Sequence, residues 1–454
     1  MASSSPASID PARLQSEIFA VGRSITAAQD SHAGGPLRGL DEAAIGLSTR
    51  DHELRAALFR LVDVTPACRN LDDLGSHLGS LLEEVQDRPV PLGVATRMAH
   101  TKAGRMALGA AVASSVRHLA HRFIAGESPA AALGKLSKLW STGIGSSVDL
   151  LGEATVTGAE ADHYAERCED ALGELARGCA AWPERTVLER DSAGAIPRVN
   201  LSVKVSALTP LVRPEAPALG RDDAVRRLRP LLRRARELGA HMHVDTESLD
   251  SLETTREVVL GLLGEEEFRD GPSAGIVLQA YLRESPAELD RILAWAESSG
   301  RRSPLVVRLV KGAYWDHESV EAQQHGWRIP VLTDKAKCDR NFESLTRRLL
   351  EARPLVRVAI ASHNLRSVSH AIALNRLRGG YDHDLELQVL RGLGDELAWS
   401  LADAGFRVRV YSPVGDLVAG MAYLVRRLLE NTSNESFLSE QYGGAPLEEL
   451  LVTP

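Results

Sequence analysis

The sequence predicts an α/β protein, a (β/α)8 barrel of the TIM type preceded by an all-helical N-terminal region. Two observations carry this prediction. After about residue 139, eight short apolar segments alternate with amphipathic helical patterns, which is typical of parallel sheets. Before that point the pattern is helical and rich in Ala and Leu, with no strand signal. Eight such units match a closed barrel better than an open sheet, and no GxGxxG turn follows any strand.

The predicted strands are short apolar runs bounded by turn residues. In chain order they are Ser146–Leu151, Val199–Val205, His241–Asp245, Gly275–Tyr281, Leu305–Val310, Val356–Ser362, Asp384–Leu390 and Phe406–Tyr411. Helical patterns such as Ala161–Ala181, Asp222–Leu238 and Pro286–Glu297 lie between them. We expect a helical arm or scaffold over 1–138, with its longest helical stretch at 92–125. The barrel would follow over 139–440, and a C-terminal tail over 441–454.

Composition places the chain among ordinary globular proteins. It has 454 residues, of which 44% are hydrophobic and 25% charged, and a formal net charge of −8. This acidic balance argues against nucleic-acid binding, and the arginine-rich run at 226–236 fits a solvated helix face better than a phosphate patch. The four cysteines are scattered, which predicts free thiols in a reducing compartment. With neither a signal-peptide pattern nor a membrane-spanning stretch, we expect a cytoplasmic protein, at most peripheral on a membrane.

Several predicted strands carry polar residues on one face, where a barrel normally packs aliphatic side chains. These residues are Ser202, Lys204 and Ser206, then Gln279 and Tyr281, then Arg308, Glu386, Gln388, Arg407, Arg409 and Tyr411. Any one of them could be a satisfied core group, but five such strands together predict a lumen that binds a ligand. Barrel sites lie at the carboxyl ends of the strands. The residues expected near those ends are Lys204, Asp245, Tyr281, His363, Asn364 and Tyr411.

Two loops and one helix narrow the ligand. Gly392 and Gly394 open a helix after the seventh strand, where phosphate is favoured, although a lone GxG is equally a plain turn. After the fifth strand, 311–315 sets a lysine beside a glycine and two aromatics, which suits a planar, phosphate-bearing cofactor. In the last predicted helix, about 415–431, one stripe holds Tyr423, Arg426, Arg427 and Glu430. Spacing alone leaves this stripe open between a salt-bridged surface and a clamp for a small anion.

At these positions the sequence resembles the proline dehydrogenase family, particularly the proline dehydrogenase portion of bifunctional proline-utilisation proteins. The matching strings run in family order from about Val148 to Leu438. They are VDLLGEATVT, LSVKVSAL, HVDTES, IVLQAYL, VVRLVKGAYWD, TDKA, ASHN, LELQVLRGLG, RVYSPVGD and YLVRRLLENTSNESFL. The resemblance implies a flavoprotein barrel that holds FAD, oxidises L-proline to Δ1-pyrroline-5-carboxylate and passes electrons to a membrane quinone.

The resemblance also implies roles for individual residues. The catalytic set would be Lys204, Asp245, Arg308, Tyr411, Arg426 and Arg427, with the two terminal-helix arginines pairing with the proline carboxylate. Tyr314, Leu390 and Tyr423 would complete the proline pocket. FAD would contact Gln279, Arg308, Lys311, Gly312, Ala313, Trp315, Thr333, Lys335, His363, Asn364, Gln388 and Glu430, with Arg308 near flavin N5. To these we add Gly392 and Gly394 from the position of their loop, and we expect no metal.

Tyr411 favours proline as the substrate, because a smaller residue there accompanies hydroxyproline preference in the family. The alternatives are a flavin dehydrogenase for hydroxyproline or another imino acid, and a non-catalytic barrel that binds a metabolite. No aldehyde dehydrogenase sequence follows Pro454. We therefore expect either a monofunctional enzyme or a piece of a bifunctional one, with a pyrroline-5-carboxylate dehydrogenase as a partner.

Overall fold

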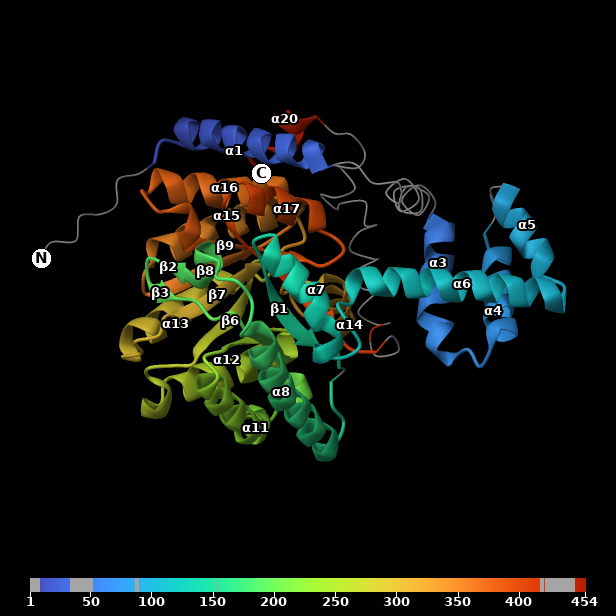
Figure 1. Cartoon of the computed structure of the whole chain (residues 1–454), viewed down its shortest axis with the longest axis horizontal. Coiled ribbons are helices and arrows are strands. Elements are labelled where there is room, and N and C mark those ends of the chain that lie inside the picture. Colours follow the sequence, from blue (N-terminus) through green and yellow to red (C-terminus); the bar gives the residue numbers. More distant parts are fainter. Residues whose placement is uncertain (1–8, 33–51, 86–89, 153, 417–419, 421–445) are drawn as a thin grey trace, which may run out of the picture.

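Eight parallel strands close into a barrel in the computed structural model, which describes residues 9–32, 52–85, 90–152, 154–416, 420 and 446–454 (Figure 1). The strands are β1 Ile144–Leu150, β4 Asn200–Lys204, β5 His241–Asp245, β6 Ser273–Gln279, β7 Leu305–Val310, β8 Val356–Ala361, β9 Leu385–Leu390 and β10 Arg407–Val414. Strands that follow one another along the chain are neighbours, and β1 closes the ring by pairing with both β4 and β10. This confirms the predicted fold, and each predicted strand overlaps an observed one.

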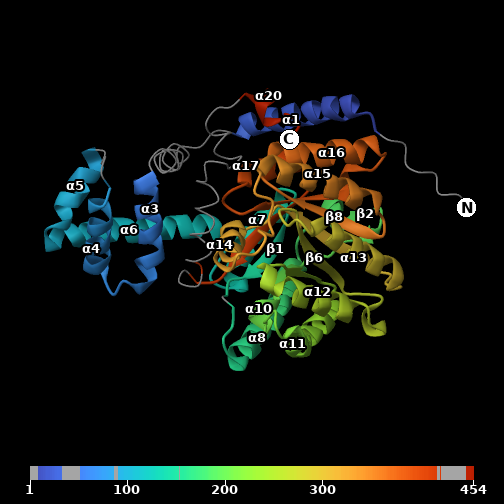
Figure 2. The ribbon, with the colours of Figure 1, turned by 180° about the vertical axis from the view of Figure 1, so that it is seen from behind.

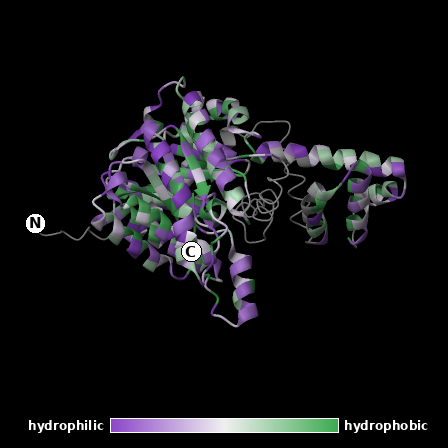
Figure 3. Ribbon diagram, turned by 90° about the horizontal axis from the view of Figure 1, so that it is seen from below, coloured by the Kyte–Doolittle hydropathy of each residue, from purple (hydrophilic) through white to green (hydrophobic). Residues whose placement is uncertain are grey.

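Helices surround the barrel and cover the outer face of the strands (Figure 2). The longer ones are α8 Gly158–Cys179, α11 Pro217–Glu237, α12 Leu249–Leu263, α13 Ser285–Ser298, α14 Trp315–His325, α15 Lys335–Glu351, α16 Leu365–Leu377 and α17 Asp395–Asp403. In α8 the buried side chains include Tyr164, Cys168, Leu172 and Leu175, which recur every three or four residues and form one apolar stripe. Figure 3 shows hydrophobic residues concentrated in the body of the barrel.

Two short insertions differ from the predicted strand pattern. The second strand ends at Lys204, and α10 (Val205–Leu208) turns the chain, so the prediction that Ser206 continues the lumen face is wrong. Its hydroxyl instead donates to the Glu247 carboxylate. Before β4 the chain also forms α9 (Thr186–Glu189) and a hairpin of β2 (Arg190–Asp191) and β3 (Gly194–Ala195). A two-residue strand is too short to show a period, so the hydrophobic pattern does not predict this hairpin.

The N-terminal region divides into a helix on the barrel and a bundle beside it (Figures 1 and 2). Helix α1 (Pro11–His32) packs on α16 and α17, and its Ile18, Val21 and Ile25 lie in the main core. The bundle consists of α3 His52–Val64, η1 Thr65–Ala67, α4 Leu71–Glu83, α5 Val90–Ala99 and α6 Lys102–Phe123. It has its own small core, and α7 (Pro129–Ser141) leads from it to β1. The arm expected over 1–138 therefore contributes its first helix to the barrel.

The predicted helical stretch 92–125 is two helices rather than one. Thr101 interrupts it, and the Thr101 hydroxyl accepts the Gly104 N–H at 3.1 Å to begin α6. A Cβ on Gly104 would lie 2.0 Å from the Met98 carbonyl oxygen, so the close turn requires glycine. The reversal lets α6 pack against α4.

The arginine-rich run lies on α11 and is paired with acids on α11 itself and on neighbouring elements. Arg227, which is buried, binds Asp162 at 2.7 Å and Asp223 at 2.6 Å, and Arg233 pairs with Glu267. This supports a salt-bridged helix face rather than a phosphate patch. None of the helices within the described ranges is long and apolar enough to cross a membrane.

Truncation of the Ile18 side chain should show that the packing of α1 contributes to the stability of the barrel. The side chain is fully buried against the main core, so Ile18→Ala should lower the free energy of unfolding by about 2–5 kcal/mol. Chemical denaturation measures the change. Ser16→Ala, on the exposed face of the same helix, is the control and should shift it by less than about 0.5 kcal/mol. Equal effects of the two substitutions would show that α1 does not pack as described.

Candidate active site

Polar side chains from several strands meet in the barrel lumen around Arg308. Its Nη1 donates to Asp245 Oδ1 at 2.6 Å, and its Nε donates to Gln388 Oε1 at 2.7 Å. The Tyr411 hydroxyl donates to the other Asp245 oxygen at 2.6 Å, and the Arg308 guanidinium carbon lies 5.4 Å from the Tyr411 ring centroid. Burial raises the pKa of Tyr411, so its phenol remains a donor at neutral pH. The structure therefore brings together Asp245, Arg308, Gln388 and Tyr411.

Lys204 completes this group at the carboxyl end of β4. Its Nζ lies 2.5 Å from Asp149 Oδ1 and 3.7 Å from Asp245 Oδ2. Burial alone would lower the pKa of Lys204, but the two carboxylates outweigh it and raise the pKa. Lys204 is therefore a permanent cation at neutral pH rather than a base.

Asp149 is a site residue that the sequence analysis missed, although it lies in the quoted string VDLLGEATVT. It stands between Val148 and Leu150 in β1 and is 2% exposed. An acid flanked by Val148 and Leu150, on the same strand parity as Ser147, is the signal that could have found it. Ser147 was missed as well, whereas Ser202 was predicted on the lumen face; their hydroxyls lie 3.2 and 3.3 Å from Arg308 Nη2.

The loop after β7 passes over Tyr281 with little space to spare. Gly312 has a φ of 134°, and a Cβ there would lie 2.3 Å from the Tyr281 ring, so this passage requires glycine. Lys311 pairs with Asp339, and the Trp315 indole N–H donates to the Leu332 carbonyl at 3.2 Å. Trp315 is 41% exposed, as a side chain available for stacking should be. Ala313 and Tyr314 lie between them in the same loop.

Gln279, at the end of β6, has a buried side-chain oxygen that accepts no hydrogen bond from the described residues. Its amide nitrogen donates to the Glu247 carbonyl at 2.9 Å, while its Oε1 has no hydrogen-bond partner among the described residues. Thr333 and Lys335 lie nearby on the rim, because the Leu332 N–H donates to the Tyr281 carbonyl at 2.7 Å. Thr333 is exposed and Lys335 is half-buried.

The loops after β8 and β9 are tied to each other. His363 Nε2 accepts the Leu390 N–H at 2.9 Å, and Asn364 caps α16 by accepting the Ser367 N–H at 2.8 Å. Gly394 lies against His363, where a Cβ would come within 2.7 Å of the imidazole.

In the glycine loop after β9, the backbone groups of Gly392 are hydrogen-bonded to side chains of the protein. The Gly392 N–H donates to the Asp395 carboxylate at 3.0 Å, and Arg122 donates to the Gly392 carbonyl at 3.0 Å. These contacts favour the plain-turn interpretation of Gly392-Leu393-Gly394, since a phosphate there would meet the Asp395 carboxylate. The assignment of both glycines to a cofactor remains a prediction.

The stripe of Tyr423, Arg426, Arg427 and Glu430 lies outside the described residues. Its proposed roles remain predictions.

Below Arg308 the lumen network continues toward the amino end of the barrel. The Gln388 amide donates to Glu386 Oε1 at 2.6 Å, and Arg409 binds both Glu386 oxygens at 3.0 and 3.2 Å. Burial alone would raise the pKa of Glu386, but Arg409 and Arg407 outweigh it and hold the pKa at about 2. Glu386 is therefore ionised inside the barrel.

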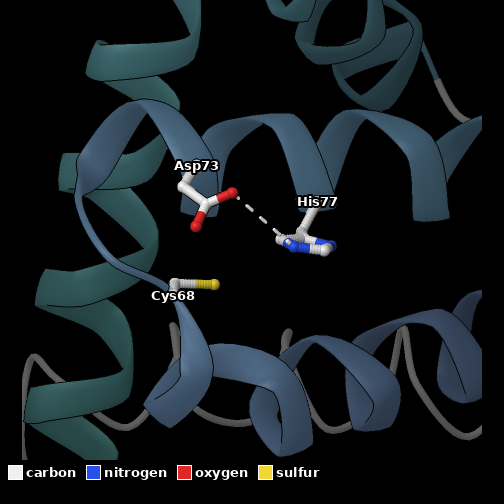
Figure 4. Close-up of side chains that lie close together, drawn as sticks. All are labelled: Cys68, Asp73 and His77. Atoms are coloured by element: carbon white, nitrogen blue, oxygen red, sulfur yellow. Dashed lines mark ion pairs between the residues drawn. The ribbon is translucent and has the colours of Figure 1, made fainter.

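Within the described part of the chain, two groups of side chains have the residue types and spacing of metal ligands. One is Cys68, Asp73 and His77 in the N-terminal bundle, where Asp73 faces His77 at 3.8 Å (Figure 4); the other is Asp250, His317 and Glu321. Burial, with a smaller effect of Asp73, raises the pKa of the Cys68 thiol, which donates to the Val64 carbonyl at 3.4 Å.

The profile of the proline dehydrogenase family matches residues 132–440. The chain belongs to this family. A second profile, the proline utilization A N-terminal domain, matches residues 15–123 and so covers α1 and the bundle. The resemblance identified from the motifs is confirmed.

The chain is similar both to proteins named as bifunctional and to proteins named as proline dehydrogenases alone. Bifunctional protein PutA of Salmonella typhimurium is 32% identical over 78% of this chain, and proline dehydrogenase of Deinococcus radiodurans is 29% identical over 71%. The match covers 26% of the PutA length and 89% of the Deinococcus protein. The crystal structure of proline utilization A from Bdellovibrio bacteriovorus, inactivated by N-propargylglycine, has a TM-score of 0.88 at 35% identity. It covers 97% of this chain and 44% of that one.

The depressed pKa of Glu386 predicts a specific loss of stability in acid. With an ordinary value of 4.5 and a folded value of about 2, its contribution is present above pH 4.5 and is lost as the pH falls toward 2. Glu386→Gln should be less stable at neutral pH, and its unfolding free energy should fall by about 3 kcal/mol less than the parent's across that window.

Urea denaturation at several pH values measures this difference. Glu253→Gln, an exposed acid on α12, is the control and should follow the parent at every pH. An unchanged acid slope in Glu386→Gln would show that this carboxylate is not held as described.

Proposed function

We propose that this barrel is an FAD-dependent proline dehydrogenase, which oxidises L-proline to Δ1-pyrroline-5-carboxylate and passes the electrons to a quinone. The observation that supports the proposal is the arrangement at the carboxyl ends of the strands. There Asp245 accepts hydrogen bonds from Arg308 and Tyr411 and lies 3.7 Å from the Lys204 ammonium, in a chain of this family. A pyrroline-5-carboxylate dehydrogenase, joined to the barrel in the bifunctional relatives' manner, is the expected partner for the product.

The mouth of the barrel offers the contacts that a cyclic amino acid needs. Lys204 supplies a cation for the carboxylate, which cannot be buried without paired, hydrogen-bonded charges, and Arg426 and Arg427 would supply two more. Asp245 fixes the hydroxyl of Tyr411, so the ring presents a rigid wall. We propose that Leu390, Tyr314 and Tyr423 complete the apolar side of the pocket.

The residues at the mouth fit a flavin cofactor. Gln279 carries a buried acceptor without a partner among the described residues, Gly312 allows close backbone approach, and Trp315 exposes an indole face. The other proposed contacts are Lys311, Ala313, Thr333, Lys335, His363, Asn364, Gln388 and Glu430. A bound flavin would supply the acceptor for the hydride that leaves the proline carbon beside the nitrogen. Arg308, fixed by Asp245 and Gln388, would set a positive charge beside the cofactor ring and favour its reduced form.

Neither Lys204 nor Tyr411 can take the substrate's ammonium proton at neutral pH, because their raised pKa values keep both groups protonated. Only the neutral amine has the lone pair that stabilises loss of hydride from the adjacent carbon. The ammonium proton must therefore leave before hydride transfer, either to solvent or to a carboxylate of the pocket such as Asp245.

Proline should bleach the flavin of the purified protein. After loading with FAD, anaerobic L-proline should remove the visible flavin absorbance, at a rate that rises with pH as the amine deprotonates. Lys204→Met should weaken proline binding by about tenfold to a hundredfold, through loss of a charged hydrogen bond. Lys138→Met, an exposed lysine on α7, should not. Failure to bind FAD, or a flavin that proline leaves oxidised, would contradict the proposal.

The size of residue 411 should decide between proline and hydroxyproline. Tyr411→Ser removes the ring that walls the pocket, so kcat/KM for trans-4-hydroxyproline relative to proline should rise about tenfold or more. Tyr411→Phe, which keeps the ring and loses only the bond to Asp245, is the matched control and should leave this ratio nearly unchanged. Equal ratios in all three proteins would remove Tyr411 from the substrate pocket.

A further inference from the structure

A second polar cavity lies at the amino-terminal end of the barrel, opposite the proposed proline site. Its free volume is about 20 Å³, which is room for one water-sized ion or molecule. Its lining comes from the first residues of the strands and includes Asn200, His241, Ser273, Arg357, Arg407 and Arg409. The hairpin β2–β3 contributes Asp191 to this end by its contact with Arg357.

Two of the three arginines in the lining, Arg357 and Arg409, each form a bidentate ion pair with a carboxylate. Arg357 donates to both oxygens of Asp191 at 3.0 and 2.9 Å. Arg409 donates to both oxygens of Glu386 at 3.0 and 3.2 Å. Each carboxylate is therefore already bound in bidentate fashion by an arginine other than Arg407.

Arg407 lies between these pairs without a hydrogen bond to either acid. Its Nε is 3.6 Å from Glu386 Oε2, and its Nη2 is 3.6 Å from Asp191 Oδ2. Its side chain is 2% exposed, and neither Nε nor Nη1 has an acceptor among the described residues. A buried guanidinium with unpaired donors is expensive, so its position in a cavity wall points to an acceptor from outside the chain.

The charges around the cavity do not balance. Arg357, Arg407 and Arg409 face only two carboxylates, Asp191 and Glu386, which leaves one positive charge in excess. His241 adds none, because burial, and after it the charge of Arg409, lowers its pKa to about 3. Its ring nitrogens lie 2.8 Å from the Ser273 hydroxyl and 3.1 Å from His243.

We propose that this cavity binds one small inorganic monoanion, of the chloride class, against the free donors of Arg407. A single negative charge neutralises the excess of one positive charge, whereas a dianion would leave the cluster negative. The anion would accept from Arg407 Nε and Nη1, the two donors that lack partners among the described residues. The site lies at the opposite end of the lumen from Lys204 and Tyr411, and Gln388, which lines the cavity and accepts from Arg308, is the residue that it shares with the proposed catalytic site.

Anion-dependent thermal unfolding of the full chain tests this inference. At constant ionic strength, chloride or bromide should raise Tm over gluconate, which is too large for the cavity. The rise should be roughly 1–2 °C once the halide is about tenfold above its dissociation constant. Arg407→Met should abolish this difference. Arg302→Met, an exposed arginine paired with Asp270, is the control and should retain it. Equal Tm values for the parent in chloride and gluconate would overturn the proposal.

Anomalous diffraction from crystals grown in sodium bromide provides a second measurement, independent of whether Arg407→Met folds. A bromide peak within hydrogen-bond distance of Arg407 Nε or Nη1 is the expected result. Density for an ordered water there, without anomalous signal, would mean that solvent satisfies the guanidinium and would overturn the proposal. Neither measurement involves proline or a flavin, so the outcome is separate from that of the proposed function.

Discussion

A guanidinium enclosed in the barrel lumen is the constraint around which the site is arranged. Arg308 is 4% exposed, and an ion of this kind without acceptors would cost several kcal/mol, an order-of-magnitude figure for buried charges. Its partners Asp245, Gln388, Ser147 and Ser202 come from four different strands. Satisfying one side chain therefore fixes the relative positions of strands on opposite sides of the barrel.

The same requirement extends along the lumen. Gln388 bonds to Arg308 through its oxygen and to Glu386 through its nitrogen, so it joins the mouth to the arginines at the amino end. The opposite parity of the same strands is apolar: Val307 and Leu309, on either side of Arg308, are fully buried in the main core. The barrel thus combines a conventional hydrophobic layer beneath its helices with a charged interior. Replacing one charged side chain of that interior by an apolar one would leave its partner buried and unpaired.

Much of this fold could be predicted from local patterns, and the failures have local explanations. The predicted bounds of His241–Asp245 and Leu305–Val310 are those observed, because the first alternates polar with apolar residues and the second is a mostly apolar run between Pro304 and Lys311. The break at Thr101 depends on one hydroxyl and one close glycine contact, which a helical period does not register. The packing of α1 on the barrel depends on helices more than 300 residues away in the chain, beyond any local pattern.

By itself the sequence determined the fold class, the strand parity that places Lys204 and Arg308 in the lumen, and the family. These follow from periodicity and motif order, which neighbouring residues encode. The pairings depend on the folded barrel: Asp149 binds Lys204, Tyr411 bonds to Asp245 across 166 residues of chain, and Nε and Nη1 of Arg407 have no acceptor among the described residues. The physical reason is that ion pairing depends on distances of a few ångströms between strands, and closure of the barrel sets those distances.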